Sequence, residues 1–475
     1  MENKVSSEVS GNGFFAYVAS LIFTDLMTQG FFLSIIFYIT IFVRLRKKEK
    51  RLKLTAEQEE KLIEKWKPEP LVPEVPQDHP RLVAKFAEGK MDKYITRNGA
   101  KYFNFATFNF LNFVGNERIE NIAKITIQKY GVGSCGPRNF YGTVDVHLNL
   151  ERQLANFLGC EEVVLYSYGF ATISSAIPSY AKQGDVIFAD KAVNFAIQKG
   201  LEASKSRIEW FEHNDMVHLE KLLKKQTERD LMNPKVAAKT RRFLVVEGLY
   251  ANTGDLCPLP QIMNLKWKYK VRVFIDEAYS IGIVGRTGRG VTEYYNIDIT
   301  DVDLITGSLE YCFASTGGFC AGRSFVVSHQ RLSGLGYCFS ASLPPLLATA
   351  AGEALQLIIE KPCRLTRLRL NCEYIHLALI KIFKGTQFEI GGWQYSPIQF
   401  IYCKNKSVDE DLLLDNIVDK MKEKSFIITR ARYLEKQERF DVRQCIRVAI
   451  QSDFNQEELE KFVSAMQEVV SNYAS

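Results

Sequence analysis

Short apolar runs that alternate with helix-like stretches limit the folds open to this chain more than any other feature. Alternation of this kind predicts an α/β fold, with a mostly parallel sheet covered by helices. Such sheets bind ligands beyond the carboxyl ends of their strands, so the residues after each run are candidates for a site. The runs lie at 163–166, 186–188, 243–246, 271–275 and 304–306, and they are followed by Ser167 to Gly169, Asp190, Glu247, Asp276, and Gly307 with Ser308.

The pattern changes after about residue 350. Helix-like stretches at 351–361, 366–383 and 408–423 alternate there with strand-like runs at 398–403, 426–429 and 446–450. A last helix is expected from about Gln456 to Tyr473, with Asn455 and Glu458 as its capping pair. We therefore predict a large domain over residues 86–350 and a smaller C-terminal α/β domain over 351–475.

The N-terminal segment 1–53 predicts one transmembrane helix. Residues from about 26 to 43 are apolar and numerous enough to cross the ~30 Å hydrocarbon layer of a membrane. Seven Lys and Arg residues follow within 44–53. Because basic flanks stay in the cytosol, we expect a single-pass protein with a lumenal N-terminus and a cytosolic body. A segment lying in the membrane interface is the alternative, since Asp25 shortens the apolar span.

The sequence of residues 54–85 predicts a helix followed by a linker. Thr55 and Gln58 form a capping-box pattern that predicts a helix through Trp66. Five prolines between Pro68 and Pro80 exclude a helix or a central strand, so this stretch is expected to be extended.

Composition excludes two kinds of site. The net charge of +6 is too small to indicate nucleic-acid binding, and part of the excess flanks the apolar segment. The ten cysteines form no C-x-x-C pair and have no zinc-ligand spacing with histidine, so no metal site is predicted.

Several motifs occur in a fixed order along the chain, and the main ones are Tyr130–Thr143, Tyr166–Ala171, Ile275–Ser280, Gly285–Gly290, Gly307–Tyr311 and Phe339–Pro345. This ordered set resembles the α-oxoamine synthases. These are pyridoxal-phosphate enzymes of fold type I that condense an amino acid with an acyl-CoA and release carbon dioxide. Trp66–Pro73 and Ala431–Glu435 narrow the resemblance to the eukaryotic serine palmitoyltransferase subunit 1 family.

Three reactive positions of that family are changed here. The family pattern Gly-Thr-x-Ser-Lys-Ala aligns with Gly307–Cys312, and Tyr311 stands at the position of the lysine. A phenol cannot form a Schiff base with the cofactor aldehyde. Asn194 and Tyr279 stand where the family has histidines, while Asp276 matches the carboxylate that pairs with the pyridine nitrogen. We therefore predict no catalytic residue, a vestigial Asp276, and a chain that is inactive alone.

Members of this family are dimers whose active sites lie between subunits. The resemblance thus implies a heterodimer in which a lysine-bearing partner binds pyridoxal phosphate covalently. It also implies that Ser340 and Ser342 approach the phosphate of that partner-bound cofactor. Arg447 aligns with the arginine that holds the substrate carboxylate, and a structural ion pair is the favoured expectation here. The residues expected to face the partner are Gly133, Ser134, Cys135, Gly136 and Arg138.

The implied function is the non-catalytic subunit of serine C-palmitoyltransferase in the endoplasmic reticulum membrane. The complex would condense L-serine with palmitoyl-CoA to 3-oxosphinganine, a step of sphingolipid synthesis. Small activating subunits, Orm-type regulators and membrane lipid are the further partners that the resemblance implies. Two alternatives remain: a self-sufficient homodimer using an unrecognised lysine, and a membrane scaffold that contributes nothing to an active site.

Overall fold

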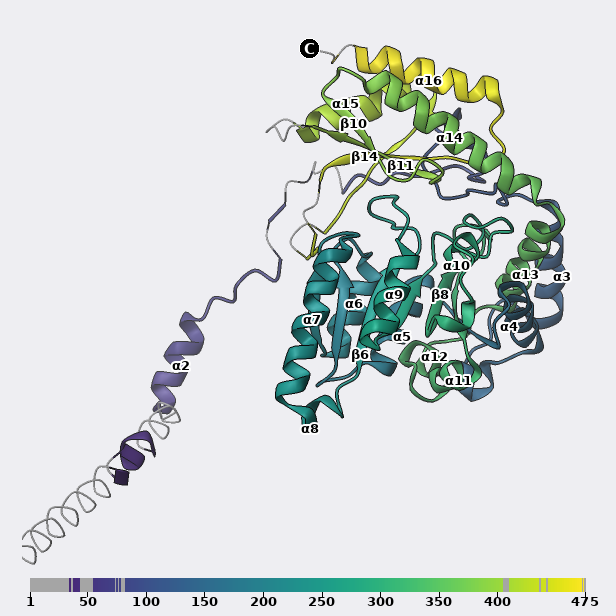
Figure 1. Cartoon of the computed structure of the whole chain (residues 1–475). Coiled ribbons are helices and arrows are strands. Elements are labelled where there is room, and N and C mark those ends of the chain that lie inside the picture. Colours follow the sequence, from purple (N-terminus) through teal and green to yellow (C-terminus); the bar gives the residue numbers. More distant parts are fainter. Residues whose placement is uncertain are drawn as a thin grey trace, which may run out of the picture. The chain divides into compact units, whose positions relative to one another are not determined.

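The computed structural model describes residues 34–35, 37–42, 54–72, 74–75, 77, 82–404, 410–434, 437–440, 443–471 and 473. The chain divides into two units, Met1–Ala84 and Lys85–Ser475 (Figure 1). The second unit holds every site discussed below.

The N-terminal unit contains the helix α2 (Ala56–Lys65). Its predicted capping box is confirmed, since the Gln58 amide donates to Thr55 Oγ1 at 3.4 Å and the Thr55 amide donates to Gln58 Oε1 at 3.1 Å. Most of the membrane segment predicted at 26–43 lies outside the described residues, although 34–35 and 37–42 are helical. No helix within the described ranges is both long and apolar enough to span a membrane.

A seven-stranded sheet forms the centre of the second unit, with the order β3-β9-β8-β7-β6-β4-β5 among the described residues. Strand β9 runs antiparallel to both its neighbours, and the other pairs are parallel, so the prediction of a mostly parallel sheet is confirmed. The strands are β3 (Glu162–Tyr166), β4 (Val186–Asp190), β5 (Arg207–Phe211), β6 (Arg242–Glu247), β7 (Arg272–Asp276), β8 (Leu304–Ser308) and β9 (Gly318–Gly322).

Helices surround this sheet (Figure 1). Their apolar residues and those of the strands form one continuous buried core, in which every residue of β4, β8 and β9 is buried. The helices are α3 (Glu117–Tyr130), α4 (Asp145–Leu158), α5 (Gly169–Tyr180), α6 (Phe195–Ser204), α7 (Met216–Met232), α8 (Pro234–Ala237), α9 (Leu259–Tyr269), α10 (Val291–Tyr294), α11 (Ser324–Ser333), α12 (Leu335–Phe339) and α13 (Pro345–Glu360).

Two smaller sheets and three helices complete the unit. One sheet has the order β10-β11-β14-β13 and is antiparallel. In the other, β2 pairs with both β1 and β12, which joins residues 94–104 to the C-terminal part of the chain. The elements are β1 (Tyr94–Arg97), β2 (Ala100–Asn104), α14 (Cys363–Phe383), β10 (Phe388–Gly391), β11 (Ile398–Cys403), α15 (Glu410–Glu423), β12 (Phe426–Ile427), β13 (Thr429–Arg430), β14 (Cys445–Ala449) and α16 (Gln456–Ser471).

Candidate functional site

A cavity of about 430 Å³ lies at the carboxyl ends of β7 and β8, where the strand pattern placed the candidate site. Asn194, Asp276, Tyr279 and Tyr311 all line it. The structure therefore brings together the four positions that correspond to the cofactor-binding and catalytic residues of the family.

Both carboxylate oxygens of Asp276 already accept hydrogen bonds. Asn194 Nδ2 donates to Oδ2 at 2.9 Å, while the Thr306 hydroxyl and the Ala278 amide donate to Oδ1 at 3.0 and 3.1 Å. Asn194 is held in place because its Oδ1 caps α6, accepting from the Ile197 amide. Burial raises the pKa of Asp276 above its usual value. Groups of the same chain thus already occupy both oxygens with which Asp276 could meet a pyridine nitrogen.

Tyr279 and Tyr311 form a stacked pair in this cavity. Their ring centroids lie 4.3 Å apart with an interplanar angle of 17°, and the Tyr279 hydroxyl donates to the Tyr311 hydroxyl at 2.9 Å. Phe108 packs its ring edge-to-face against both. Burial raises the pKa of Tyr311 to about 12, so both phenols stay neutral at physiological pH. The two rings therefore form a packed, uncharged side of the cavity, and neither side chain carries an amine.

Glu310 places a carboxylate at the N-terminus of α5. The amide of Gly169, the first residue of that helix, donates to Glu310 Oε1 at 3.1 Å. Helix N-termini favour anions, and family members hold the cofactor phosphate at such a position. This role of Glu310 was not predicted from the sequence. The available signal was an acidic residue where the family pattern has serine.

Pyridoxal phosphate does not fit the cavity as this chain builds it. An amide covers one oxygen of Asp276, and the Glu310 carboxylate occupies the helix N-terminus that would receive a phosphate. A phosphate beside Glu310 would meet a like charge, which disfavours binding. In addition, Tyr311 stands at the position where the family has its lysine.

Two more buried carboxyl groups lie beside Asp276. Burial, with a smaller contribution from the Asp276 charge, raises the pKa of Glu247 to about 8. Glu247 accepts from the amides of Asn194 and Ala251 at 2.6 and 3.1 Å. Burial likewise raises the pKa of Glu277 to about 7. Glu247 is therefore largely protonated in the folded chain at neutral pH, whereas Glu277 is near the midpoint of its ionisation.

We expect the free energy of unfolding to fall as the pH rises from about 4.5 to about 8. An unfolded Glu247 ionises near its ordinary value of 4.5 and the folded group near 8, so the folded state binds one proton more between these values and loses stability as the pH rises through that interval. Glu247→Gln should reduce the pH slope by up to about 1.4 kcal/mol per pH unit, the value for one proton. Urea unfolding at several pH values measures this slope. An unchanged slope, equal to that of the exposed control Glu423→Gln, would contradict the assignment.

The glycine-rich loop and the serine loop predicted to face a partner contact each other. Pro137 and Ala341 form an antiparallel bridge, and the Ser342 amide donates to Gly136 O at 2.9 Å. The Ser342 hydroxyl is buried and donates to Gly142 O at 2.6 Å, while Ser134 Oγ lies against it. Ser342 is therefore committed within this chain, and Ser340 is the hydroxyl of the pair that is partly exposed.

An apolar surface patch surrounds these loops; we call it the loop patch. Large apolar side chains are rarely exposed together unless they meet a partner. Gly133 and Cys135 are exposed beside it. The exposed members of the loop patch are Val132, Phe140, Tyr141, Tyr168, Phe170 and Phe339.

Two arginines differ from expectation. Arg138 does not face outward: its side chain is buried and pairs with Glu151 at 2.9 Å. Its interface prediction is therefore not supported, because the guanidinium is neutralised inside this chain. Arg447 forms no ion pair within the described part of the chain, contrary to our expectation. It lies 4.4 Å above the Phe108 ring instead.

Comparison with known proteins identifies the family. The model of aminotransferase class I and II matches residues 100–466. Serine palmitoyltransferase 1 of Dictyostelium discoideum is 41% identical over 430 residues, covering 88% of each chain. This chain belongs to the serine palmitoyltransferase 1 family. Long chain base biosynthesis protein 1 of Arabidopsis thaliana is 39% identical over 400 residues, covering 83% of this chain and 81% of the relative. The resemblance stated from the motifs is confirmed.

Solved structures agree on the fold. A serine palmitoyltransferase from Sphingomonas wittichii superimposes with a TM-score of 0.71 at 22% identity, covering 80% of this chain and 90% of its own. An S. paucimobilis serine palmitoyltransferase solved with a PLP–myriocin aldimine gives 0.72 at 22% identity over the same shares. Both show that the chain has the fold of pyridoxal-phosphate-dependent transferases.

Proposed function

We propose that this chain is the non-catalytic subunit of a serine C-palmitoyltransferase. It pairs with a lysine-bearing subunit, and the complex condenses L-serine with palmitoyl-CoA to 3-oxosphinganine in sphingolipid synthesis. The observation that carries this proposal is the altered lining of the cavity at the ends of β7 and β8: Tyr311, Glu310 and Asn194 stand at the positions where a cofactor would be held. The relatives named serine palmitoyltransferase 1 supply the reaction class.

This chain contributes to the reaction through a surface that faces the catalytic partner. Pyridoxal phosphate is held covalently by the partner, and this chain presents the loop patch toward it. Gly133, Ser134, Cys135 and Gly136 belong to the same loop, and Ser340 offers a partly exposed hydroxyl beside it. This arrangement explains why the frame of the family is kept although its reactive residues are not.

Expression of the chain alone and with a lysine-bearing partner tests this proposal. The isolated chain should retain no pyridoxal after borohydride reduction and should show no decarboxylative condensation. Co-expression should give activity, with the reduced cofactor on the partner. Turnover by the chain alone would instead support the self-sufficient homodimer.

Tyr141→Asp should weaken assembly with the partner by about thirtyfold or more, the effect of losing an interface residue worth ~2 kcal/mol. Tyr141 is fully exposed and has a φ of 64°, a conformation that aspartate tolerates, so the fold should survive. Co-purification and sedimentation measure assembly. Leu231→Asp, on the exposed end of α7, is the matched control and should assemble normally. Equal assembly of both variants would favour a different interface.

We propose that residues 26–43 anchor the complex in the endoplasmic reticulum membrane as a single span, with the body in the cytosol. The support is the apolar length and the basic flank at 44–53. Small activating subunits and Orm-type regulators would bind near this segment. An N-glycosylation acceptor placed ahead of residue 26 should be modified, and one placed in 54–85 should not. The opposite pattern would reject the orientation.

A further inference from the structure

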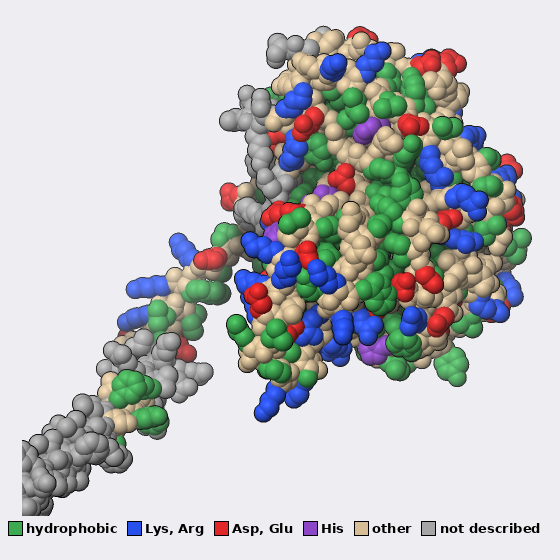
Figure 2. Space-filling view, in the orientation of Figure 1, with side chains coloured by type: hydrophobic (Ala, Val, Ile, Leu, Met, Phe, Trp, Pro, Cys, Tyr) green, Lys and Arg blue, Asp and Glu red, His purple; other side chains and the backbone are tan. Residues whose placement is uncertain are grey.

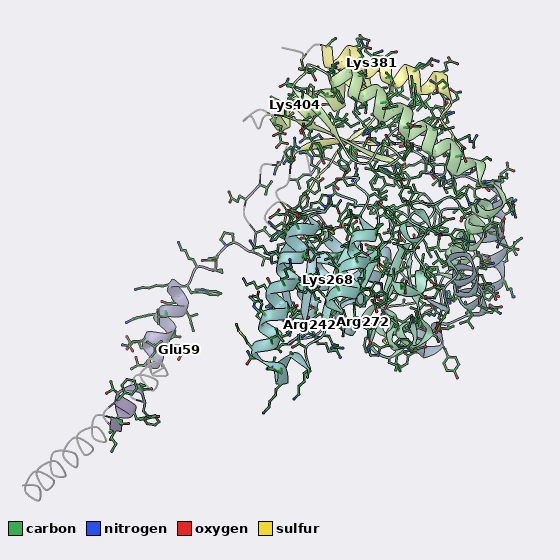
Figure 3. The ribbon with its side chains drawn as sticks, in the orientation of Figure 1. Glu59, Arg242, Lys268, Arg272, Lys381 and Lys404 are labelled. Carbon is green, nitrogen blue, oxygen red and sulfur yellow. The ribbon has the colours of Figure 1, made fainter. Side chains whose placement is uncertain are left out.

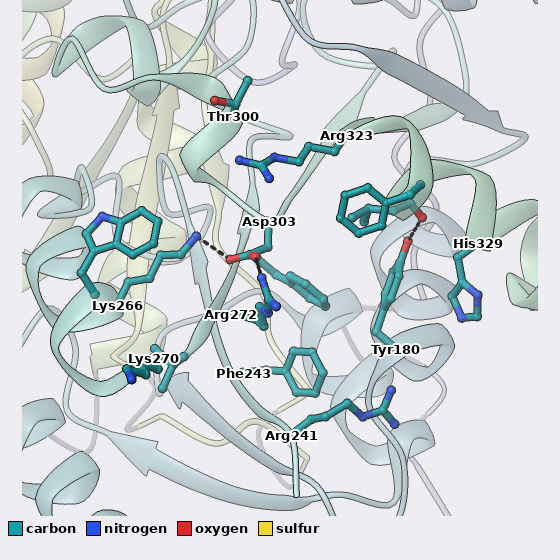
Figure 4. A pocket seen from close by; sticks show the side chains of 15 residues that line it. Tyr180, Arg241, Phe243, Lys266, Lys270, Arg272, Thr300, Asp303, Arg323 and His329 are labelled. Atoms are coloured by element: carbon teal, nitrogen blue, oxygen red, sulfur yellow. Dashed lines mark hydrogen bonds and ion pairs between the residues drawn. The ribbon is translucent and has the colours of Figure 1, made fainter. Parts of the chain in front are cut away.

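A second and larger cavity, of about 760 Å³, lies at the opposite edge of the large sheet, where β6 and β7 begin. We call it the basal cavity. Seven of its 15 lining residues are aromatic or aliphatic, and Figure 4 shows the charged Asp303 and Arg272 near the middle of the view. The volume falls within the ~300–1,000 Å³ range of small-molecule sites. The wall residues used below are Tyr180, Phe243, Trp267, Phe274 and Val326.

Cations surround this apolar interior. Lys and Arg side chains gather along the lower edge of the body in Figure 2, and Figure 3 labels Arg242 and Arg272 at that edge. Asp303 is the carboxylate among the lining residues, and it pairs with Lys266 and Arg272 at 2.7 and 2.8 Å. The lining cations are Arg241, Lys266, Lys270, Arg272 and Arg323.

Positive charge remains after these pairs are counted. Arg241 pairs with Asp185 at 2.8 Å, outside the lining. Lys270 and Arg323 form no ion pair in the part of the chain that the structure describes, and both are exposed at the rim. Backbone and side-chain hydrogen bonds, with a smaller contribution from the Arg323 charge, lower the pKa of Asp298, so a carboxylate lies near this arginine without forming an ion pair with it. Two cations outside ion pairs, beside aromatic and aliphatic side chains, favour a ligand that carries both negative charge and an apolar part.

Hydrogen bonds, an ion pair and ring contacts hold the walls of the basal cavity in place. The Tyr180 hydroxyl donates to Val326 O at 2.6 Å, which joins the end of α5 to α11. Lys266 is nearly buried at the side of the cavity, held by Asp303 and by the carbonyl of Asp301. Phe243 and Phe274 pack against each other from adjacent strands at 5.3 Å between ring centroids. A cavity fixed by such contacts requires little reordering when a ligand binds.

We propose that the basal cavity binds an anionic amphiphile, an alkyl chain that ends in a phosphate or carboxylate. The chain would lie against Trp267, Phe274 and Val326, and the head group would meet Arg323 and Lys270. A purely ionic ligand would leave the apolar wall unused, and a neutral lipid would leave the cations unused. This site is separate from the cavity at the ends of β7 and β8 and does not depend on the proposed function.

Photolabelling of the purified full chain in neutral phosphatidylcholine nanodiscs tests this proposal. The probe is dodecyl phosphate with a diazirine on its chain; dodecanol and inorganic phosphate are the competitors. Labelled peptides should come from residues 266–274 and 323–329. Unlabelled dodecyl phosphate should compete at least about tenfold better than dodecanol, which lacks the charge-assisted hydrogen bond, and at least about tenfold better than inorganic phosphate, which lacks the apolar chain.

Arg323→Glu with Lys270→Glu should weaken labelling by about tenfold or more. Lys235→Glu with Lys239→Glu changes the net charge equally at exposed lysines outside the cavity and should have no effect. Sedimentation with phosphatidic-acid vesicles tests whether the natural ligand is a membrane lipid. If the cavity variant no longer associates with the vesicles, the ligand is a lipid. If its association is unchanged, the ligand is a free acyl anion. Equal competition by inorganic phosphate, equal loss in both variants, or displacement by an oligonucleotide alone would overturn the proposal.

Discussion

Replacing Arg138 with methionine should lower the free energy of unfolding by about 3–5 kcal/mol, the cost of leaving one partner of a buried ion pair alone. The Arg138 and Glu151 side chains are 4% and 7% exposed, so water cannot replace the lost partner. Arg331 is 4.0 Å from the other oxygen of Glu151 and offers only weak compensation. Chemical denaturation of the purified chain measures the loss.

A second substitution separates charge from packing. Arg138→Met with Glu151→Gln removes both charges, while the glutamine can still accept the bond that the Leu165 amide donates to Glu151 Oε1 at 3.0 Å. The double variant should recover much of the lost stability. Arg118→Met is the matched control, because that arginine is 47% exposed although it pairs with Glu353 and Glu360, and it should change stability little. A double variant as unstable as Arg138→Met alone would show that packing, not charge, is the cause.

The five strands predicted from apolar runs all exist, because a run of consecutive apolar residues marks a strand that is buried on both faces. Strands β5 and β9 were missed. β5 (Arg207–Phe211) lies at the sheet edge and mixes charged with apolar residues, while β9 (Gly318–Gly322) contains two glycines and little β propensity. The pairing of β2 with β12 also escaped prediction, since it joins segments more than three hundred residues apart in the chain.

From the sequence, the candidate site was predicted by the reactive residues of the family that this chain lacks, and the structure shows the contacts that their replacements make. Tyr311 and Asn194 were recognised because they stand at family positions. That Asn194 donates to Asp276, and that Glu310 accepts from the Gly169 amide, depends on contacts between residues 82 and 141 positions apart. A linear pattern carries no information on such contacts. The buried Arg138–Glu151 ion pair could not be predicted for the same reason, since an arginine in a glycine-rich loop is expected to be exposed.

Tyr311→Lys alone should not give the chain a covalently bound pyridoxal. The new amine would stand at the family position, but the phosphate would still meet the Glu310 carboxylate at the N-terminus of α5. Tyr311→Lys with Glu310→Ser restores the family pattern at both positions and frees the Gly169 amide. We expect this double variant to incorporate the cofactor at least about tenfold more than the single variant, the effect of one charge-assisted hydrogen bond to the phosphate.

Incubation with pyridoxal phosphate, borohydride reduction and peptide mass spectrometry measure incorporation at residue 311. Tyr311→Lys with Glu228→Ser is the matched control, since Glu228 is an exposed glutamate on α7, and it should behave like Tyr311→Lys alone. If the lysine variant incorporates the cofactor without the change at Glu310, the carboxylate does not exclude the phosphate. If neither variant does, the Asn194 amide on Asp276 is the stronger barrier, and adding Asn194→His, the family residue, should then permit binding. Loss of the lysine is thus one of three changes that together close this cavity to the cofactor.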